Sequence, residues 1–384
     1  MQIQFTTISE PSVAAEKWLK LFTIHWEAYK TWLLENEDEA YSADLSTSQE
    51  ALRTYMPELW PTYVHLCELT NADELVARFL TGYKPPSYVS GCSNAVIKDE
   101  QTHLVRNYDH HPDLFEGVQI LTQWNHKKVI ATSDCLVGVL DGINEDGLAI
   151  SLTFGGRKKI GNGFGMPFIL RYILEFCSNV EQAVIQLTRI PSHMAYNVTL
   201  LDSLGNYKTM RLAPNEEPVI TAAIYTTNHQ KKVRWPENAA FNKTVERSTF
   251  LKHLLTEEDL TKDELIQAFL RKPLYNTMYK QGFGTLFTAA YSPQNGKVEL
   301  HWPHQSLQQS FSNFKETALT LKFNQKNSKK KRSKNFSIPY QGHTAKTMTY
   351  ANPNLDKETL DKKTKSSALS TEFITEVWSN MNKE

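Results

Sequence analysis

The sequence lacks the common signatures of metal, nucleotide and serine-hydrolase chemistry. It contains no HExxH, no paired CxxC, no Walker glycine loop and no GxSxG. These absences remove the usual support for a metal site, a nucleotide site or a serine nucleophile. We therefore expect neither a metal nor a cofactor.

Long apolar runs and an excess of one charge are also missing. Nowhere do about eighteen apolar residues run together, and the beginning, MQIQFTTISEPSVAAEKW, has neither the basic region nor the apolar stretch of a signal peptide. Because 42 basic residues balance 42 acidic ones, no global field attracts nucleic acid or an anionic membrane. We expect a small-molecule partner, no nucleic acid and no membrane.

Cysteine is scarce as well. The 384 residues contain four cysteines without the close, regular spacing of a disulfide-stapled domain: Cys67, Cys92, Cys135 and Cys177. This pattern favours reduced thiols and a cytoplasmic protein. Three of them look structural, since Cys67 and Cys177 lie in helical patterns and Cys135 in a predicted strand. The oligomeric state stays open, and a homo-oligomer is among the alternatives.

The pattern of secondary structure changes near residue 84. Residues 13–83 repeat apolar positions at helical spacing, and Pro85 and Pro86 end this helical part. From Cys92 on, short β-rich runs alternate with turns. These predicted strands cover residues 93–97, 103–108, 129–140, 148–154, 197–202, 207–212, 285–292 and 297–302, the last two joined by a turn at 293–296. Helices are predicted at 167–187, 243–255, 257–269 and 370–381.

Cys92 is the strongest candidate nucleophile. It stands directly after Gly91, at the start of a β-rich run. A cut before Cys92 would free an α-amino group whose pKa of roughly 8 suits it to act as the general base for the thiol. Gly91 has no Cβ, so it leaves room for the thiol to attack the Gly91 carbonyl and tolerates a strained backbone. The pair predicts self-cleavage between Gly91 and Cys92.

Polar residues that can support the thiol occur further along the chain. Arg106 and Asp109 end a predicted strand that a hairpin would bring back beside Cys92. There Asp109 can hold the α-amino group, and Arg106 can lower the pKa of the thiol. Thr153 and Phe154 end another strand and can line the pocket. Asn228 closes a later strand, and its amide can donate to an oxyanion, which is worth about 3 kcal/mol in the transition state.

Each of these residues also has a plain structural interpretation. Arg106 and Asp109 can form an ordinary ion pair, and Asn228 can satisfy backbone donors in a turn. Four histidines are candidates for a Cys-His pair, but their spacing favours none of them, so we interpret them as surface or packing residues. These are His103, His110, His111 and His229.

Taken together in order and spacing, the motifs resemble the penicillin acyltransferase family of N-terminal-nucleophile enzymes, which is distantly related to choloylglycine hydrolases and penicillin V acylases. The resemblance covers most of residues 50–305. It is carried by Met56-Pro-Glu-Leu, Gly91-Cys-Ser93, Arg106-Asn-Tyr-Asp109, Gly142-Ile-Asn-Glu-Asp-Gly-Leu148, Leu170-Arg-Tyr172, Tyr196-Asn-Val-Thr199 and Thr227-Asn-His229.

The resemblance implies an α+β fold, a four-layer αββα sandwich of two antiparallel sheets. It further implies that residues 1–91, helical by the pattern above, are a leader and that residues 92–323 form the catalytic domain. Beyond Phe323 the composition shifts to Lys, Ser, Asn and Thr, with a basic run at 329–334, and this predicts a flexible, basic, polar tail over 324–384. Position by position, Cys92 is then the nucleophile, Arg106 and Asp109 support it, and Asn228 contributes to the oxyanion hole. Thr153, Phe154 and Arg247 are further candidates for the pocket or the oxyanion site.

The function expected from these residues is that of a self-activated cysteine amidohydrolase. It would cleave a linear, non-peptide N-acyl amide through an acyl-enzyme, with an amide or thioester as substrate. Two alternatives stay open. One is an acyltransferase that moves an acyl group from a coenzyme A thioester to an amine, and the other is a non-catalytic scaffold that binds a partner through its basic tail.

Overall fold

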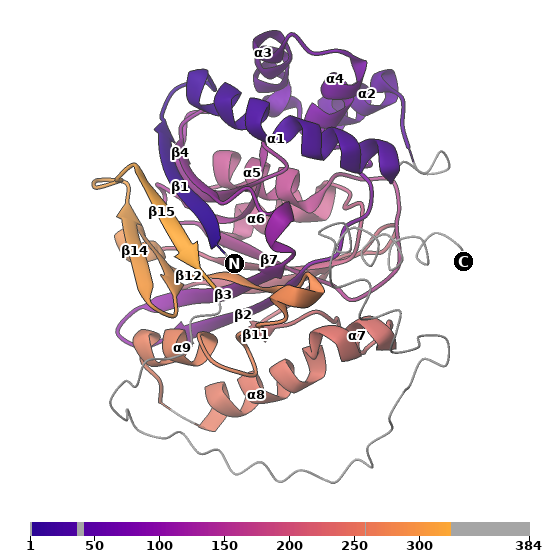
Figure 1. Ribbon diagram of the computed structural model, residues 1–384. Helices are drawn as coiled ribbons and strands as arrows, with labels where there is room; N and C mark the ends of the chain where they lie inside the picture. The colour runs from indigo at the N-terminus through magenta and orange to yellow at the C-terminus, as the bar shows by residue number, and fades with distance from the viewer. Residues whose placement is uncertain (1, 37–41, 258, 324–384) are drawn as a thin grey trace, which may run out of the picture. The chain divides into compact units, whose positions relative to one another are not determined.

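Two β-sheets stack face to face at the centre of the chain (Figure 1). The larger sheet has nine strands in the order β10-β9-β8-β7-β6-β5-β4-β1-β15, and the smaller has six in the order β11-β2-β3-β12-β13-β14. The strands of the larger sheet are β1 (Gln2–Glu10), β4 (Val118–Thr122), β5 (Val129–Asp134), β6 (Gly138–Asn144), β7 (Ala149–Phe154), β8 (Tyr196–Leu201), β9 (Tyr207–Leu212), β10 (Val219–Thr221) and β15 (Thr317–Lys322). Those of the smaller are β2 (Gly91–Lys98), β3 (Thr102–His110), β11 (Tyr225–Thr226), β12 (Gly284–Ser292), β13 (Lys297–Trp302) and β14 (Gln305–Ser310).

The computed structural model describes residues 2–36, 42–257 and 259–323. The predicted tail at 324–384, with its basic run and the helix expected at 370–381, lies outside the described residues. Within them, no helix has both the length and the apolar character that crossing a membrane requires.

Helices cover the outer face of each sheet. α5 (Met166–Phe176) and α6 (Val180–Arg189) pack on the nine-stranded sheet, and α8 (Thr244–Glu257) and α9 (Lys262–Phe269) pack on the six-stranded one. In Figure 1 these two helical layers lie above and below the sheets. The expected α+β fold with four layers in the order αββα is confirmed. The helix α7 (Pro236–Asn242) precedes α8, and short 3-10 turns lie at Pro57–Leu59, Pro112–Leu114, Tyr279–Gln281 and Pro293–Asn295.

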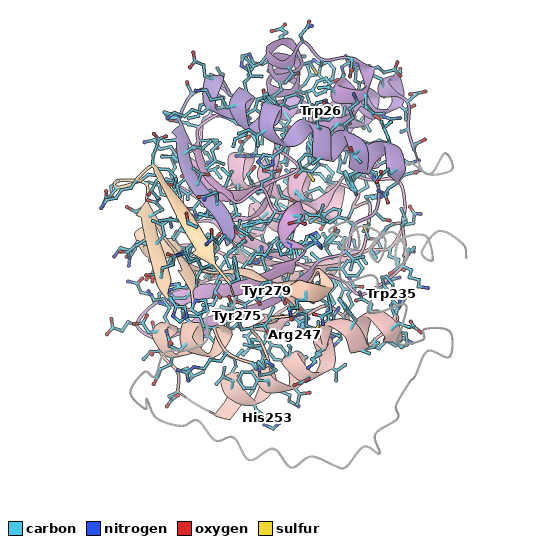
Figure 2. The ribbon with its side chains drawn as sticks, in the orientation of Figure 1. Trp26, Trp235, Arg247, His253, Tyr275 and Tyr279 are labelled. Carbon is cyan, nitrogen blue, oxygen red and sulfur yellow. The ribbon has the colours of Figure 1, made fainter. Side chains whose placement is uncertain are left out.

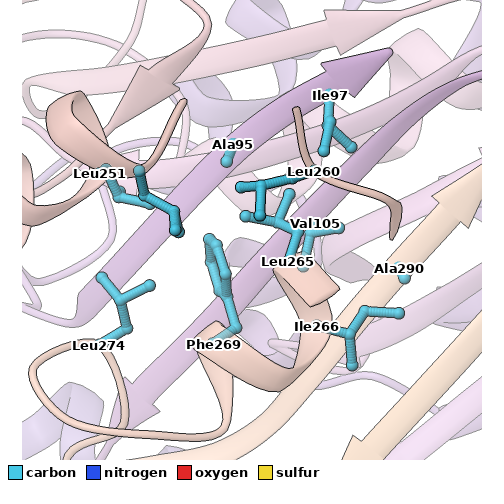
Figure 3. Packing of buried hydrophobic residues seen from close by; sticks show 11 residues of the cluster. Ala95, Ile97, Val105, Leu251, Leu260, Leu265, Ile266, Phe269, Leu274 and Ala290 are labelled. Carbon is cyan, nitrogen blue, oxygen red and sulfur yellow. The ribbon is translucent and has the colours of Figure 1, made fainter. Parts of the chain in front are cut away.

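Burial from both sides explains the composition of the central strands. Every residue of β3 and of β12 is buried, because the other sheet covers one face of these strands and helices cover the other. Figure 3 shows how the helical side is packed, with apolar side chains of α8, α9 and the following loop lying against short apolar side chains of the strands. The cluster consists of Ala95, Ile97, Val105, Leu251, Leu254, Leu260, Leu265, Ile266, Phe269, Leu274 and Ala290.

The first ninety residues are more than a helical leader. They form α1 (Glu16–Glu35), α2 (Leu45–Tyr55), α3 (Trp60–Thr70) and α4 (Glu74–Leu80), which agree with the helical pattern predicted at 13–83. However, they begin with strand β1, which the sequence analysis missed and which pairs in parallel with β4 in the nine-stranded sheet. The nine-stranded sheet is therefore not purely antiparallel.

A turn interrupts the β-rich run predicted at 129–140. Strands β5 and β6 are separated by Cys135, Leu136 and Val137, and the φ angles of Cys135 and Leu136 are 53° and 62°. Cys135 therefore lies in a turn and not in a strand as predicted. Two successive residues in the left-handed region usually require Asn or Gly, and the sequence carries neither here. The hairpin of β12 and β13, in contrast, is confirmed with its turn at Pro293–Asn295.

Candidate active site

Cys92 is held at three separate atoms by three different side chains. It is fully buried in β2, opposite Tyr108 of β3. Its backbone N–H donates to Oδ1 of Asn228 at 3.0 Å, and its carbonyl oxygen accepts from Nη1 of Arg247 at 2.5 Å. Its Sγ accepts from Nη2 of Arg106 at 3.1 Å. The structure thus brings the predicted nucleophile together with three of the predicted site residues.

Arg106 reaches the thiol from a buried ion pair. Its guanidinium pairs with Asp141 and also donates to the Leu140 carbonyl at 3.0 Å. Asp141 in turn accepts from the hydroxyls of Thr132 at 2.8 Å and Tyr291 at 2.5 Å. Burial alone would lower the pKa of Arg106, but the charges of Asp141, Cys92 and two tyrosines together outweigh burial and raise it. Arg106 therefore remains a cation at the sulfur.

The Cys92 thiol nevertheless has a higher pKa than the thiol of a free cysteine, so it holds its proton more strongly. Burial raises the pKa of Cys92, and Arg106 only partly opposes this. The hydrogen-bond partners of Sγ are Arg106 and, weakly at 3.9 Å, the Ser90 hydroxyl. None of the four histidines considered from the sequence is among them. A base for this thiol has to come from elsewhere.

Asp109 lies beside the bond before Cys92, because it is the cross-strand partner of Gly91. Its Oδ1 accepts from the Thr285 hydroxyl at 2.6 Å, and its Oδ2 lies 3.9 Å from Nη1 of Arg247. Oδ2 is buried and makes no hydrogen bond. Burial raises the pKa of Asp109, while Arg247 opposes the shift.

Asn228 uses both ends of its amide. Besides Cys92, its Oδ1 accepts from Nη2 of Arg247 at 2.6 Å, which fixes the orientation of the amide. Its Nδ2 faces the carbonyl oxygens of Ser90 and Phe154, each at 3.4 Å. Hydrogen bonds of this length are weak, so Nδ2 can donate to a new oxygen that lies beside it at little cost.

Arg247 is more central than its place among the further candidates for the pocket or the oxyanion site indicated. Figure 2 shows it on α8, facing the six-stranded sheet. It contacts Cys92, Ser93 and Asn228 directly, and its Nε donates to the Asn242 carbonyl at 2.9 Å. Burial lowers the pKa of Arg247, and Asp109 opposes this. Arg247 thus links Cys92, the amide of Asn228 and the carboxylate of Asp109.

Thr153 and Phe154 lie at the end of β7, near Asn228. The Thr153 hydroxyl donates to the Thr227 carbonyl at 3.1 Å and accepts from Asn197 at 3.0 Å, so its hydrogen-bonding capacity is used inside the scaffold. Phe154 contributes its backbone carbonyl to Asn228, and its ring packs on Tyr196 and Trp235.

Sequence reasoning missed the residues that position these groups. Asp141 and Tyr291 hold Arg106, and Thr285 holds Asp109. Asp141 was within reach of a sequence argument, since it is a carboxylate within an otherwise apolar β-rich run. Thr285 and Tyr291 carry no such signal.

Comparison with known proteins agrees with the resemblance inferred from the motifs. The model of the acyl-coenzyme A:6-aminopenicillanic acid acyl-transferase family matches residues 96–307. No curated protein sequence matches significantly.

Several solved structures are similar at low sequence identity. A mutant conjugated bile acid hydrolase from Clostridium perfringens has a TM-score of 0.44 at 12% identity, with 63% of this chain and 100% of that chain covered. A penicillin V acylase from Agrobacterium tumefaciens has a TM-score of 0.36 at 12% identity, covering 58% and 86%. The Caenorhabditis elegans ortholog of N-acylethanolamine-hydrolyzing acid amidase has a TM-score of 0.41 at 14% identity, covering 60% and 100%.

Proposed function

Because this chain belongs to the acyl-coenzyme A:6-aminopenicillanic acid acyl-transferase family, we propose that it cuts its own backbone before Cys92 and then cleaves N-acyl amides with the freed cysteine. Family membership makes it an enzyme of the N-terminal-nucleophile hydrolases and acyltransferases, which act on C–N amide bonds. The observation that carries the proposal is that three side chains contact three different groups of Cys92. Asn228 accepts a hydrogen bond from its backbone N–H, Arg247 donates to its carbonyl oxygen, and Arg106 donates to its thiol.

In the proposed maturation, Sγ of Cys92 attacks the Gly91 carbonyl carbon. The C–N bond to Cys92 breaks, the thiol proton passes to the leaving nitrogen, and the acyl group now forms a thioester with Sγ. Water then hydrolyses this thioester, which leaves a Gly91 carboxylate, a free thiol and a new α-amino group. The proposed division of the chain is therefore residues 1–91 and a catalytic part that begins at Cys92.

The new α-amino group meets the need for a base at the thiol. Burial holds the pKa of the thiol above its usual range, and an amine with a pKa of roughly 8 can accept its proton. The unsatisfied Oδ2 of Asp109 lies across from Gly91 and is suited to accept a hydrogen bond from this amine. Arg106 stabilises the thiolate as it forms.

In the proposed turnover, Cys92 attacks a substrate amide and its α-amine carries the thiol proton to the departing amine. Nδ2 of Asn228 gives up its two long contacts and donates to the oxyanion, assisted by a backbone amide. Water then releases the acid and regenerates the thiol. The proposed substrates are small-molecule amides. The proposed compartment is the cytoplasm, which the cysteine pattern favours.

Acyl transfer is the second candidate, favoured by the acyl-transferase description of the matching family. The acyl-enzyme is the same, but it is loaded from a thioester and an amine takes the acyl group in place of water. Transfer of a labelled acyl group from a coenzyme A thioester to an amine, with little free acid, would support it.

The test of self-activation is the denatured mass of the purified protein beside that of Cys92→Ala. We expect chains of 91 and 384 − 91 = 293 residues from the wild type, while the variant stays whole. If both proteins stay whole, Cys92 has no free α-amine and the proposed mechanism is wrong. A Cys92→Ala protein that retains full amidase activity would also overturn it.

A further inference from the structure

A second group of buried polar side chains lies near Cys92 and has no part in the proposed reaction. It contains two carboxylic acids, Glu116 and Asp134, and three tyrosines, Tyr29, Tyr88 and Tyr196. We call these five residues the acidic cluster. Each of the two acids is 8% exposed.

Hydrogen bonds satisfy only part of the acidic cluster. Oε1 of Glu116 accepts from the Tyr29 hydroxyl at 2.5 Å and from the Leu136 N–H at 2.8 Å, but Oε2 is buried without a hydrogen bond. The hydroxyls of Tyr88 and Tyr196 are also buried, their rings lie 6.5 Å apart, and each hydroxyl affects the pKa of the other. A buried carboxylate oxygen without a partner is destabilising, so the free Oε2 of Glu116 points to a missing partner.

The charge of the acidic cluster is also unbalanced. Among the described residues, no lysine or arginine forms an ion pair with Glu116 or Asp134 within 4.0 Å. Arg106 interacts electrostatically with Asp134, and Arg171 with Glu116. Both arginines already form ion pairs with other acids, Arg106 with Asp141 and Arg171 with Glu175. Burial, followed by the charge of Glu116, raises the pKa of Asp134 well above its ordinary value. A cation is the group that would relieve both acids.

Electrostatic contacts connect the acidic cluster to the nucleophile. Tyr108, which lies opposite Cys92 in the sheet, has its pKa raised by burial and by the charges of Asp134 and Cys92. The pKa of Tyr196 is raised by burial and by the same two groups. Tyr88 and Asp134 are 9% and 8% exposed, while Cys92 is fully buried.

We propose that the acidic cluster binds a positively charged ammonium group of the substrate, a few atoms away from the carbonyl that Cys92 attacks. This inference rests on the proposed function and narrows its substrate to amides that carry a cation. Three N–H donors of an ammonium can meet the free Oε2 of Glu116, a carboxylate oxygen of Asp134 and a tyrosine hydroxyl. Tyr29 and Tyr88 come from residues 1–91, so the segment before the cleavage site contributes to substrate choice.

The test compares a cationic and a neutral reagent at Cys92. The purified full chain is treated with aminoethyl methanethiosulfonate or ethyl methanethiosulfonate, and peptide mass mapping separates labelling of Cys92 from that of Cys135. We expect the cationic reagent to be favoured at Cys92, and this preference to fall by about tenfold or more in Asp134→Asn and Glu116→Gln. Tyr88→Phe, which removes only a hydroxyl group and should fold normally, is expected to lower this preference less. Glu181→Gln, on the exposed face of α6, is the matched control.

Two outcomes separate this inference from the proposed function. If the cationic preference is the same in the wild type, in Tyr88→Phe and in both acid variants, the acidic cluster does not bind a cation. A hydrolysis assay with the p-nitroanilides of 6-aminohexanoic and hexanoic acid then supplies the activity readout. Equal cleavage of both anilides together with an unchanged reagent preference overturns the inference and leaves the function standing. An uncut, inactive chain that still favours the cationic reagent overturns the function alone.

Discussion

Gly91 lies directly against the ring of Phe283. A Cβ built on Gly91 would fall 2.2 Å from Cζ of Phe283 and 3.0 Å from Cβ of Asp109. The ring of Phe283 packs on that of Phe241 at 5.0 Å, so it cannot move aside freely. The residue before Cys92 therefore has to be glycine for reasons of space on the side of Phe283.

Replacing Gly91 with alanine should slow self-cleavage. The added methyl group pushes β2 away from Phe283 and Asp109 and misaligns the carbonyl that Cys92 attacks, so we expect the rate to fall by roughly tenfold or more. The measurement is the fraction of cut chain over time by mass spectrometry. Phe283→Leu opens the space and should partly restore cleavage in the double variant. Cleavage of Gly91→Ala at the wild-type rate would remove Phe283 from this account.

Replacing Asp109 with asparagine should severely slow maturation or turnover. The change removes the negative charge that faces Arg247 and the acceptor proposed for the α-amine, a loss on the order of 3 kcal/mol or about a hundredfold in rate. The measurements are the rate of chain cutting and the kcat on an amide. Asp113→Asn, whose side chain is 80% exposed just after the same strand, is the control. Wild-type rates for both steps would show that Asp109 is not part of the site.

The protein should lose stability as the pH falls from about 6.5 to about 4. Burial lowers the pKa of His193 from 6.5 to about 4, and its Nδ1 lies 2.7 Å from the Gly161 carbonyl oxygen. The unfolded chain therefore binds a proton throughout this window while the native state does not, which costs up to about 3 kcal/mol. Above pH 6.5 both states are neutral at this residue and the effect vanishes.

Denaturant unfolding at pH 7.5 and pH 4.5 measures this loss in the wild type and in His193→Asn. The difference between the two pH values should be smaller in the variant. His126→Asn is the matched control, because His126 is exposed and its φ of 73° suits asparagine. An identical pH dependence in His193→Asn and the wild type would contradict the assignment.

Replacing Glu10 with alanine should loosen the first helix from the nine-stranded sheet. The carboxylate of Glu10, at the end of β1, accepts from the N–H groups of Ala15, Lys17 and Trp18 at 2.9, 2.9 and 3.1 Å. These are the unsatisfied donors at the start of α1, so the free energy of unfolding should fall by about 2 kcal/mol. Glu16→Ala, an exposed acid in the same turn, should change it by less than about 0.5 kcal/mol. Equal effects of the two changes would rule out the capping role.

Local patterns in the sequence indicate the types of most elements and single out Cys92 as the proposed nucleophile. Helical spacing before Pro85, alternation after Cys92 and the turn between β12 and β13 are local patterns that depend on residues a few positions apart. Gly91 followed by Cys92 is likewise a local chemical signal, because the base proposed for the thiol is its own α-amine. The family and the four-layer fold followed from the order of such signals.

Tertiary structure alone decided which distant groups meet at Cys92. Arg247 lies 155 positions after Cys92 and Thr285 lies 176 positions after Asp109, and no local pattern encodes either contact. The same holds for β1, whose place beside β4 depends on a sheet edge formed by residues far along the chain, and for the left-handed turn at Cys135 and Leu136. Such contacts are selected by packing and by satisfying buried polar groups across the whole core, and these constraints exist only once the chain has folded.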